Sequence, residues 1–538
     1  MNRLVSTQST QKDLLWFALV AAIAILVHGW IALNDKTTFT FSDSVDYMFM
    51  ADFYRGMIYG GDVDSTRAFY RITRFPPLFP ALLGALGGGS EQQHLAAVIS
   101  NLIAVGGVFA VWLWVKRDFE SAATASAVAI AIALYPAHFL LNLSPVSEPL
   151  AILLICCVFS LLLRPRLTVG RLLLISFVVG IAPLARGALL PLPIAFVLWL
   201  VISGRFSWRQ MVSPTIISFT PFLLWTIYRY LLGSEQYSEH LNAEQFSSSS
   251  VVWPDAIWTQ PIALFKSFES AWIRSKDSIA VLLCTAAISV TAIAGCCIRV
   301  YRNRIDAWFL VGYIILILVW PFPGELSRFL VVAYPVILVS SITFLDAVQS
   351  RLFRFTRPYL RLVIFAAIGF ASAPVIALFL HRATLPIDTE LLGDKLEPPF
   401  FLAASDADAL LNAEHFGRAR YLLKQASERI PAEGCLYATP PQVATLYSGR
   451  VALTYPLDLG KDSEAASRRL LLCDFYFIAT WSAPEYGLER YYPIDVLKGW
   501  AKPVLVSRIG DGADGSVSAA LFQRVDRPLE TTNDKPDN

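Results

Sequence analysis

The sequence predicts a polytopic α-helical membrane protein with about eleven transmembrane helices and a C-terminal α/β domain outside the cytoplasm. Three observations lead to this fold class. Hydrophobic residues make up 55% of the 538 residues and charged residues only 16%, whereas soluble domains carry about 25% charged residues. The apolar residues gather in long runs within residues 1–381, while residues 382–527 resemble an ordinary soluble domain. Short basic clusters separate the apolar runs.

The apolar runs are long enough to cross a bilayer, which takes about 20 residues of helix. The first run, 14–33, has no clear cleavage site after it, so we expect a retained helix and not a signal peptide. The run at 172–202 is too long for one crossing and short for two, and contains several prolines. The expected spans lie at 14–33, 95–115, 124–141, 146–163, 172–202, 214–232, 278–298, 307–320, 329–345 and 362–380.

Basic residues decide how many times the run at 172–202 crosses, because Lys and Arg near span ends prefer the cytoplasm. Two crossings place every short basic loop on one side, whereas one crossing would send the last three clusters outside. We therefore predict eleven spans, a cytoplasmic N-terminus and a C-terminal domain outside. The clusters lie at 3–12, 116–117, 164–171, 205–209, 299–304 and 351–361.

The first outer loop, residues 34–94, holds the acidic residues Asp43 and Asp46 at the start of an expected interfacial helix. Arg71 and Arg74 follow, ahead of a short apolar helix at 78–86. These side chains could simply be solvated, and the residues alone favour that interpretation. Alternatively, one acid is a general base and the two arginines are placed for an anion.

Arg186 lies inside an apolar, proline-rich segment. A charge at membrane depth is costly and usually faces a cavity or a partner. A functional role and a structural ion pair explain it equally well. Glu148, and Glu325 with Arg328, also lie at outer ends of spans and could be its partners.

The C-terminal domain alternates helical and strand-like stretches, which favours a layered α/β fold. Cys435 and Cys473 begin two expected strands, so a disulfide between neighbouring parallel strands and two buried thiols are both open. The other cysteines lie in apolar runs without metal-ligand spacing. We expect helices at 404–411 and 416–428, strands at 435–438, 451–454, 475–478 and 519–522, and a disordered tail at 528–538.

Several short motifs follow one another along most of the chain. They are Asp43-Ser44-Val45-Asp46-Tyr47, Arg74-Phe75-Pro76-Pro77-Leu78-Phe79-Pro80, Ser144-Pro145-Val146-Ser147-Glu148-Pro149, Arg186-Gly187, Arg328-Phe329 and Leu446-Tyr447-Ser448-Gly449-Arg450. In this order they resemble bacterial members of the GT-C glycosyltransferase superfamily, including the protein mannosyltransferase-like and aminoarabinose transferase-like enzymes. Asp43 is followed by Ser44, so the Asp-Glu pair of some relatives is missing.

The resemblance implies an inverting glycosyltransferase in the cytoplasmic membrane that takes a sugar from a polyprenyl-phosphate donor. A glycan, a lipid or a protein would be the acceptor, on the outer face. Asp43 or Asp46 would be the catalytic base, and Tyr47 and Glu148 would bind substrate. A divalent cation, Mg or Mn, could replace some arginines, although the sequence has no dedicated metal cluster. The arginines implied in donor-phosphate binding are Arg71, Arg74, Arg186 and Arg328.

Two other function classes compete with this interpretation. A transporter or flippase would explain the spans, the broken helix and the buried arginine, but not the large outer domain. A scaffold protein would leave the outer acids without a role. The net charge of +2 gives no indication of a nucleic-acid partner.

Overall fold

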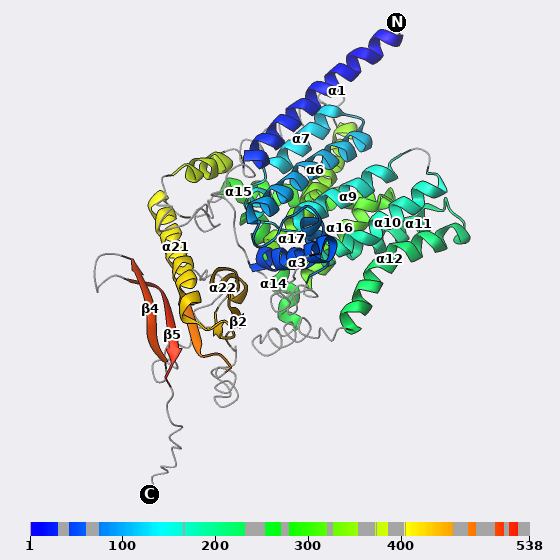
Figure 1. The fold of residues 1–538 in the computed structure, drawn as a ribbon. Helices are drawn as coiled ribbons and strands as arrows, with labels where there is room; N and C mark the ends of the chain where they lie inside the picture. Colours follow the sequence, from blue (N-terminus) through cyan, green and yellow to red (C-terminus); the bar gives the residue numbers. More distant parts are fainter. Residues whose placement is uncertain are drawn as a thin grey trace, which may run out of the picture. The chain divides into compact units, whose positions relative to one another are not determined.

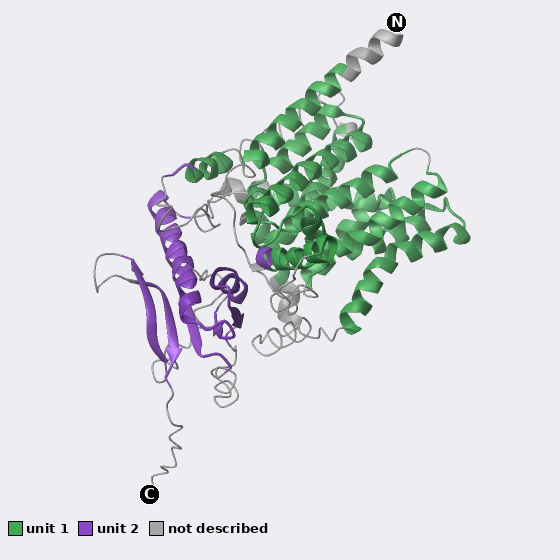
Figure 2. Cartoon of the chain, in the orientation of Figure 1, with its two compact units in different colours: residues 1–39, 46–383 green, residues 40–45, 384–538 purple. Residues whose placement is uncertain are grey.

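Helices form the described part of the first 383 residues, and strands appear only from residue 435 onward (Figure 1). The chain divides into two units, residues 1–39 with 46–383 and residues 40–45 with 384–538 (Figure 2). The computed structural model describes residues 2–30, 42–60, 75–164, 167–231, 253–270, 279–319, 326–352, 372, 374–385, 403, 405–438, 440–453, 455, 472–479, 501–509 and 516–525.

The first unit is a bundle of apolar helices, as the sequence predicts. Its elements are α1 (Asn2–Ala24), η1 (Ile25–Gly29), α3 (Ser42–Tyr59, whose first residues belong to the second unit), α5 (Leu78–Ala85), α6 (Gln93–Phe119), α7 (Ala122–Ala133), α8 (Pro136–Asn142), α9 (Glu148–Leu162), α10 (Val169–Ala185), η3 (Gly187–Leu189), α11 (Pro191–Ser203), α12 (Trp208–Leu231), α14 (Trp253–Ser270), α15 (Ile279–Tyr301), α16 (Ile305–Leu318) and α17 (Leu326–Leu352).

Length and apolarity separate these helices into groups. Among the described residues, four helical stretches are long and apolar enough to cross a bilayer. The pair α7 and α8 would count as a fifth, although it bends by 55°. Six further apolar helices are shorter. A helical membrane bundle is thus confirmed, whereas the count of eleven spans stays a prediction. The four long stretches are Gln11–Gly29, Gln93–Phe119, Trp208–Leu231 and Leu326–Gln349.

The long run at 172–202 forms two helices, α10 and α11, joined by the short turn η3. Pro191 opens α11, a position where the missing N–H of proline costs nothing. Arg186 ends α10 with an extended backbone, at φ −155° and ψ 121°. The break therefore falls at the proline cluster and puts Arg186 at the junction of the two helices.

One end of the bundle is held by charged contacts around Asp118, at the end of α6. Asp118 accepts ion pairs from Arg299 and Arg304, each at 2.7 Å, and Arg299 also pairs with Asp306 at 2.6 Å. Arg117 binds the carbonyl of Ser160, near the end of α9, at 2.9 Å. We call this the basic end. Because α9 finishes there, its first residue, Glu148, lies at the other end.

Glycines allow close contacts between helices at two places in the bundle. A Cβ at Gly295 of α15 would overlap the carbonyl oxygen of Ser340 on α17. A Cβ at Gly84 of α5 would likewise overlap the carbonyl oxygen of Ala51 on α3. Small residues at such interfaces let backbones approach, which is how helices associate without a hydrophobic driving force in lipid. The contact at Gly84 fixes α3, which carries Asp46 and Tyr47.

The second unit is a mixed sheet covered by one long helix. The strand order is β2-β1-β3-β5-β4, with β1 parallel to β2 and β3, and β5 antiparallel to β3 and β4. Ser405 and Asp408 form a capping box at the start of the helix. The elements are α21 (Asp406–Arg429), β1 (Cys435–Tyr437), α22 (Pro441–Ser448), β2 (Val451–Leu453), β3 (Phe475–Ala479), β4 (Ala501–Ile509) and β5 (Ser516–Arg524).

Two details of this unit differ from expectation. The two expected helices, 404–411 and 416–428, are one continuous helix, α21, because its buried face continues through the expected break, with Ala409, Ala413 and Gly417 at a spacing of four residues. The strand β4 was not expected, since Lys502, Pro503 and Arg508 interrupt its apolar pattern. Such residues suit an edge strand, where one side faces solvent.

The disulfide alternative for the two cysteines is confirmed. Cys435 and Cys473 are bonded, with their Cα atoms 5.1 Å apart. The reason is the expected one: Leu436 on β1 is paired with Phe475 on the parallel strand β3, so the strand starts lie side by side.

Arg450 has a structural role, because its guanidinium binds the carbonyls of Ser427 and Ile430 at the end of α21.

Candidate active site

Helix α3 brings Tyr47 to the end of the bundle opposite the basic end. The Tyr47 ring lies 4.9 Å from that of Phe75 and 5.1 Å from that of Phe79, measured between centroids. Its hydroxyl lies 3.0 Å from Oγ of Ser147. Two expected motifs, the first acidic element and the double-proline element, thus meet at the segment that precedes α9.

Glu148 is the first residue of α9, and Pro149 follows it. An acid in the first turn of a helix is stabilised by the helix dipole, and proline is well suited to that turn. The Glu148 side chain has no exposed surface at all. A buried carboxylate needs partners that balance its charge.

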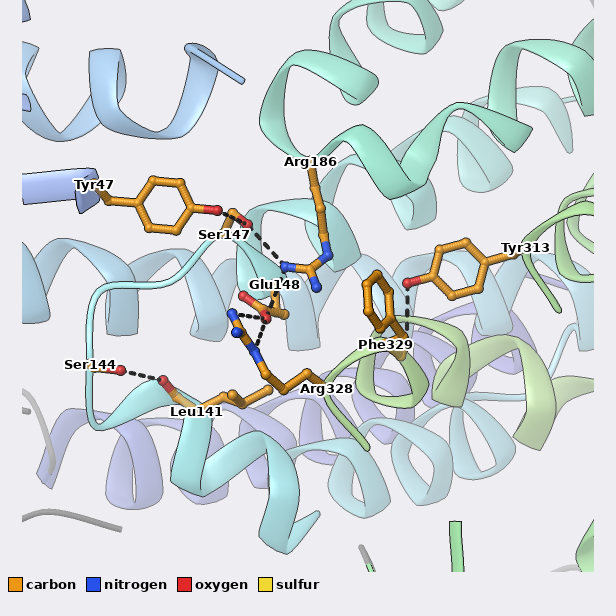
Figure 3. A network of polar contacts seen from close by, with 9 residues as sticks. All are labelled: Tyr47, Leu141, Ser144, Ser147, Glu148, Arg186, Tyr313, Arg328 and Phe329. Carbon is orange, nitrogen blue, oxygen red and sulfur yellow. Dashed lines mark hydrogen bonds and ion pairs between the residues drawn. The ribbon is translucent and has the colours of Figure 1, made fainter. Parts of the chain in front are cut away.

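Two arginines from distant helices supply that balance (Figure 3). Nη1 of Arg186 and Nη2 of Arg328 each lie 2.9 Å from the same atom, Oε1 of Glu148. Nε of Arg328 donates to that oxygen as well, at 3.0 Å. Nη1 of Arg186 also donates to Oγ of Ser147, at 3.3 Å. The ion pair that the sequence left open therefore exists, with Glu148 as its acid.

Charge is not balanced within this group. Two guanidinium groups face one carboxylate, so these described side chains carry a net charge of +1. Both arginine side chains are only 11% exposed. Arg328 lies in the first turn of α17, where the helix dipole disfavours a cation. Nε of Arg186 has no hydrogen-bond partner among the residues that the structure describes. The arrangement can therefore accept an anion.

Aromatic residues hold the two arginines in place. The guanidinium of Arg186 lies 4.8 Å over the ring of Phe329, the residue next to Arg328. The hydroxyl of Tyr313 donates to the carbonyl of Phe329 at 3.2 Å (Figure 3). A Cβ at Gly187 would lie 4.0 Å from Pro76. Two further motifs, around Arg186 and Arg328, are therefore brought to the double-proline element.

Helix α3 is also fastened to the loop that follows α5. The carboxylate of Asp52 accepts hydrogen bonds from the backbone N–H and the hydroxyl of Ser90. Arg55 forms an ion pair with it at 3.2 Å. Burial raises the pKa of Asp52, against the hydrogen bonds from Ser90, which lower it. These contacts of Asp52 fix the orientation of α3 and therefore the position of Tyr47.

The remaining predicted residues divide into two groups. Asp43 lies in the first turn of α3, half-buried, and Asp46 lies one turn later, fully buried. Arg71, Arg74 and Glu325 lie outside the described residues. Sequence analysis did not assign a role to Ser147 or Tyr313. Ser147 could have been noticed, since it directly precedes Glu148 in a quoted motif, whereas no pattern marks Tyr313 within its apolar helix.

The chain was compared with known proteins. No family profile matches it, and no curated protein matches it in sequence. Two solved structures are similar in fold. The archaeal oligosaccharyltransferase AglB from Archaeoglobus fulgidus, in complex with an inhibitory peptide and a dolichol-phosphate, is 11% identical, with a TM-score of 0.51 over 97% of this chain and 75% of AglB. ArnT from Cupriavidus metallidurans, bound to undecaprenyl phosphate, is 13% identical, with a TM-score of 0.50 over 95% of this chain and 98% of ArnT.

The chain shares the fold of AglB and ArnT. At these identities the similarity establishes the fold and not the substrate. The shared fold agrees with the helical bundle and the C-terminal mixed sheet. The apolar helices mark the chain as an integral membrane protein.

A divalent cation does not fit the described part of this candidate site. No group of three or more His, Cys, Asp or Glu side chains with metal-binding geometry lies among the described residues. Glu148 is also unsuited to hold a cation, because two guanidinium groups already surround its carboxylate and would repel one. We therefore derive no step through a metal.

Proposed function

We propose that the protein is an inverting glycosyltransferase that moves a sugar from a polyprenyl-phosphate donor to an acceptor on the outer face of the cytoplasmic membrane. The observation that carries the proposal is the convergence of Arg186 and Arg328 on Glu148. Buried ionisable groups in a membrane bundle are costly, and they are usually kept for function. The fold shared with AglB, an oligosaccharyltransferase, supports this class of reaction.

The charge of the site favours a donor with a single phosphate. A sugar linked to a lipid through one phosphate is a phosphodiester with one negative charge, which balances the net charge of +1 on Arg186, Arg328 and Glu148. A pyrophosphate linkage would carry two negative charges and leave one unbalanced in a buried place. Arginine also matches the geometry of phosphate oxygens through its planar set of donors.

In the proposed step a carboxylate removes the proton from an acceptor hydroxyl, and the oxygen attacks the anomeric carbon of the sugar. The bond between that carbon and the phosphate oxygen breaks, and its electron pair leaves with polyprenyl phosphate. Attack opposite the leaving group inverts the anomeric centre. The leaving phosphate gains negative charge, which the two guanidinium groups would stabilise.

Asp43 is the first choice for the base, and Asp46 the second. Asp43 lies in the first turn of α3 and is partly exposed, whereas Asp46 is fully buried. A base must reach the proton that it abstracts, which favours the accessible residue. Asp43 and Tyr47 are four residues apart, and so they lie on one face of α3. Arg71 and Arg74 remain proposed phosphate ligands on the strength of the motif.

Glu148 has a proposed role that differs from direct substrate binding. Its Oε1 accepts hydrogen bonds from both arginines, so it would keep the two guanidinium groups together at a spacing that suits phosphate oxygens. Ser147 supports this geometry by joining Arg186 to the Tyr47 hydroxyl. The C-terminal unit would help to hold the acceptor, which could be a glycan, a lipid or a protein.

Transfer by the purified protein in lipid nanodiscs tests the proposal directly. Synthetic polyprenyl-phosphate sugars would be supplied with extracted envelope glycans, lipids and proteins, and the products identified by mass spectrometry. We expect a glycosylated product and release of polyprenyl phosphate, both strongly reduced at low donor concentration when Arg186→Ala is used. Movement of the labelled lipid between leaflets without any transfer would instead support the alternative, a flippase or transporter.

A further inference from the structure

Four buried polar side chains form a cluster beside the segment that carries Ser147 and Glu148. They are His28 on η1, Asn101 on α6, and His138 and Asn142 on α8. None is more than 1% exposed. Asn101 donates from Nδ2 to the carbonyl of Asn142 at 2.9 Å, and the Asn142 amide lies 3.1 Å from Nδ1 of His28. The rings of His28 and His138 meet edge to face, with centroids 5.0 Å apart.

The contacts of each histidine set its tautomer. Nδ1 of His138 lies 3.2 Å from the carbonyl of Ile132, so it must carry the proton, and Nε2 is an acceptor. Nδ1 of His28 faces the amide nitrogen of Asn142, so it accepts, and Nε2 carries the proton. The two Nε2 atoms are therefore one donor and one acceptor.

Four atoms of the cluster find no protein partner in the described part of the chain: Nε2 of His28, Nε2 of His138, Oδ1 of Asn101 and Oδ1 of Asn142. Leaving buried polar atoms unsatisfied is unfavourable, and such groups are commonly satisfied by internal water. A buried water typically makes about three hydrogen bonds. One water that accepts from His28 can donate to His138 and to one amide oxygen.

The place of the cluster connects it with the candidate active site. His138 binds the Ile132 carbonyl beside the 55° bend between α7 and α8. Asn101 holds Asn142, the last residue of α8, only a few residues ahead of Ser147 and Glu148. His138 also lies within electrostatic range of Glu148.

We propose that His28, Asn101, His138 and Asn142 enclose a binding site for a structural water, and that this hydrated cluster positions the Ser147–Glu148 segment for donor phosphate. The proposed water-binding site depends only on the contacts and burial of these four side chains. The positioning role rests on the proposed function, because it acts through the arginines that Glu148 holds. The four side chains are positioning residues and do not touch the substrate.

Two substitutions of His138 separate the proposal from a purely structural role. His138→Gln places an amide where Nε2 lies and loses the contact with Ile132. His138→Asn keeps a donor for Ile132 and loses the group at Nε2. We expect undecaprenyl phosphate to bind His138→Asn about tenfold more weakly than wild type, the effect of one buried hydrogen bond, and to bind His138→Gln nearly as well. The opposite order would overturn the proposal, since the Ile132 contact would then be the important one.

Controls and a second measurement keep the test decisive. His94 on α6 is exposed, so His94→Gln and His94→Asn should bind the lipid equally. Nitrogen-15 NMR of the six labelled histidines in the wild-type chain needs no ligand. It should show a protonated Nε2 for His28, a protonated Nδ1 for His138, and magnetisation transfer from water to both rings.

Two NMR results would overturn the water site: a direct Nε2-to-Nε2 hydrogen bond between His28 and His138, or no transfer from water. If wild type binds no undecaprenyl phosphate, the proposed function and the positioning role both fail, and NMR still decides the water site. The two failures are therefore distinguishable.

Discussion

Arg186 and Arg328 reach the same oxygen atom, Oε1 of Glu148, each at 2.9 Å. They come from the end of α10 and the start of α17, and the carboxylate between them opens α9. Three helices thus depend on one acid for their relative placement at this end of the bundle. These three side chains together carry one positive charge, so the proposed function links the stability of the fold with anion binding.

Removing either arginine should weaken donor use far more than acceptor use. We expect Arg186→Ala and Arg328→Ala to raise the donor KM by about 10- to 100-fold, since a charged hydrogen bond contributes about 1.5–3 kcal/mol. Replacement of either arginine by Lys should restore donor use only in part, because Lys lacks the planar set of donors of a guanidinium group. Arg205→Ala, at an exposed site, is the control. Equal rises in donor and acceptor KM would indicate a purely structural ion pair.

Glu148→Gln should destabilise the folded protein, because two buried guanidinium groups would lose their counter-charge. Breaking a buried pair in this way costs about 3–5 kcal/mol. Undecaprenyl phosphate should raise the Tm of this variant more than that of wild type, because the phosphate would replace the missing charge. Glu414→Gln, which breaks a partly exposed pair with Arg418 within one turn of α21, should cost less than about 1 kcal/mol. An equal Tm rise in Glu148→Gln and wild type would contradict the phosphate site.

Asp43→Asn should abolish transfer and leave membrane insertion, folding and binding of polyprenyl phosphate unchanged. The reason is that an amide cannot take the acceptor proton. Single-turnover transfer and lipid binding, measured on the same preparation, separate the two effects. Full activity in Asp43→Asn with an inactive Asp46→Asn would move the role to Asp46. If both variants stay active, neither acid is the base.

Cys435 and Cys473 should resist alkylation until a reductant is added. The replacement of both by Ser should lower the stability of the C-terminal unit by about 2–4 kcal/mol, the usual contribution of a disulfide. Mass spectrometry of alkylated peptides before and after reduction gives the result. Labelling of both thiols without reductant would rule out the bond in the native protein.

The orientation in the membrane remains a prediction that fusions can test. A reporter active only outside the cytoplasm should be active after Asn538 and silent at Arg302. The expectation rests on the bias of Lys and Arg toward the cytoplasm. The opposite pair of results would place the C-terminal domain inside, away from a donor on the outer leaflet, and would remove the proposed function.

The sequence was sufficient for features that depend on local composition. The helical bundle follows from apolar runs and the break beside Arg186 from its prolines, whereas the Cys435–Cys473 bond was one of two open alternatives. The meeting of Arg186, Arg328 and Glu148 could be offered only as one alternative, because contacts between distant helices leave no periodic pattern. The buried cluster around His28 and His138 was not anticipated, since single polar residues in apolar helices usually have no role beyond packing.

The basic end has a consequence for how the bundle can move. A carrier that alternates access must open each end of its bundle in turn. Opening this end would pull Asp118 or Asp306 away from Arg299, and these three side chains are no more than 4% exposed. Separating such buried charges costs several kcal/mol unless new partners are ready. The ion pairs of Arg299 therefore resist the opening of the basic end that such a carrier would need.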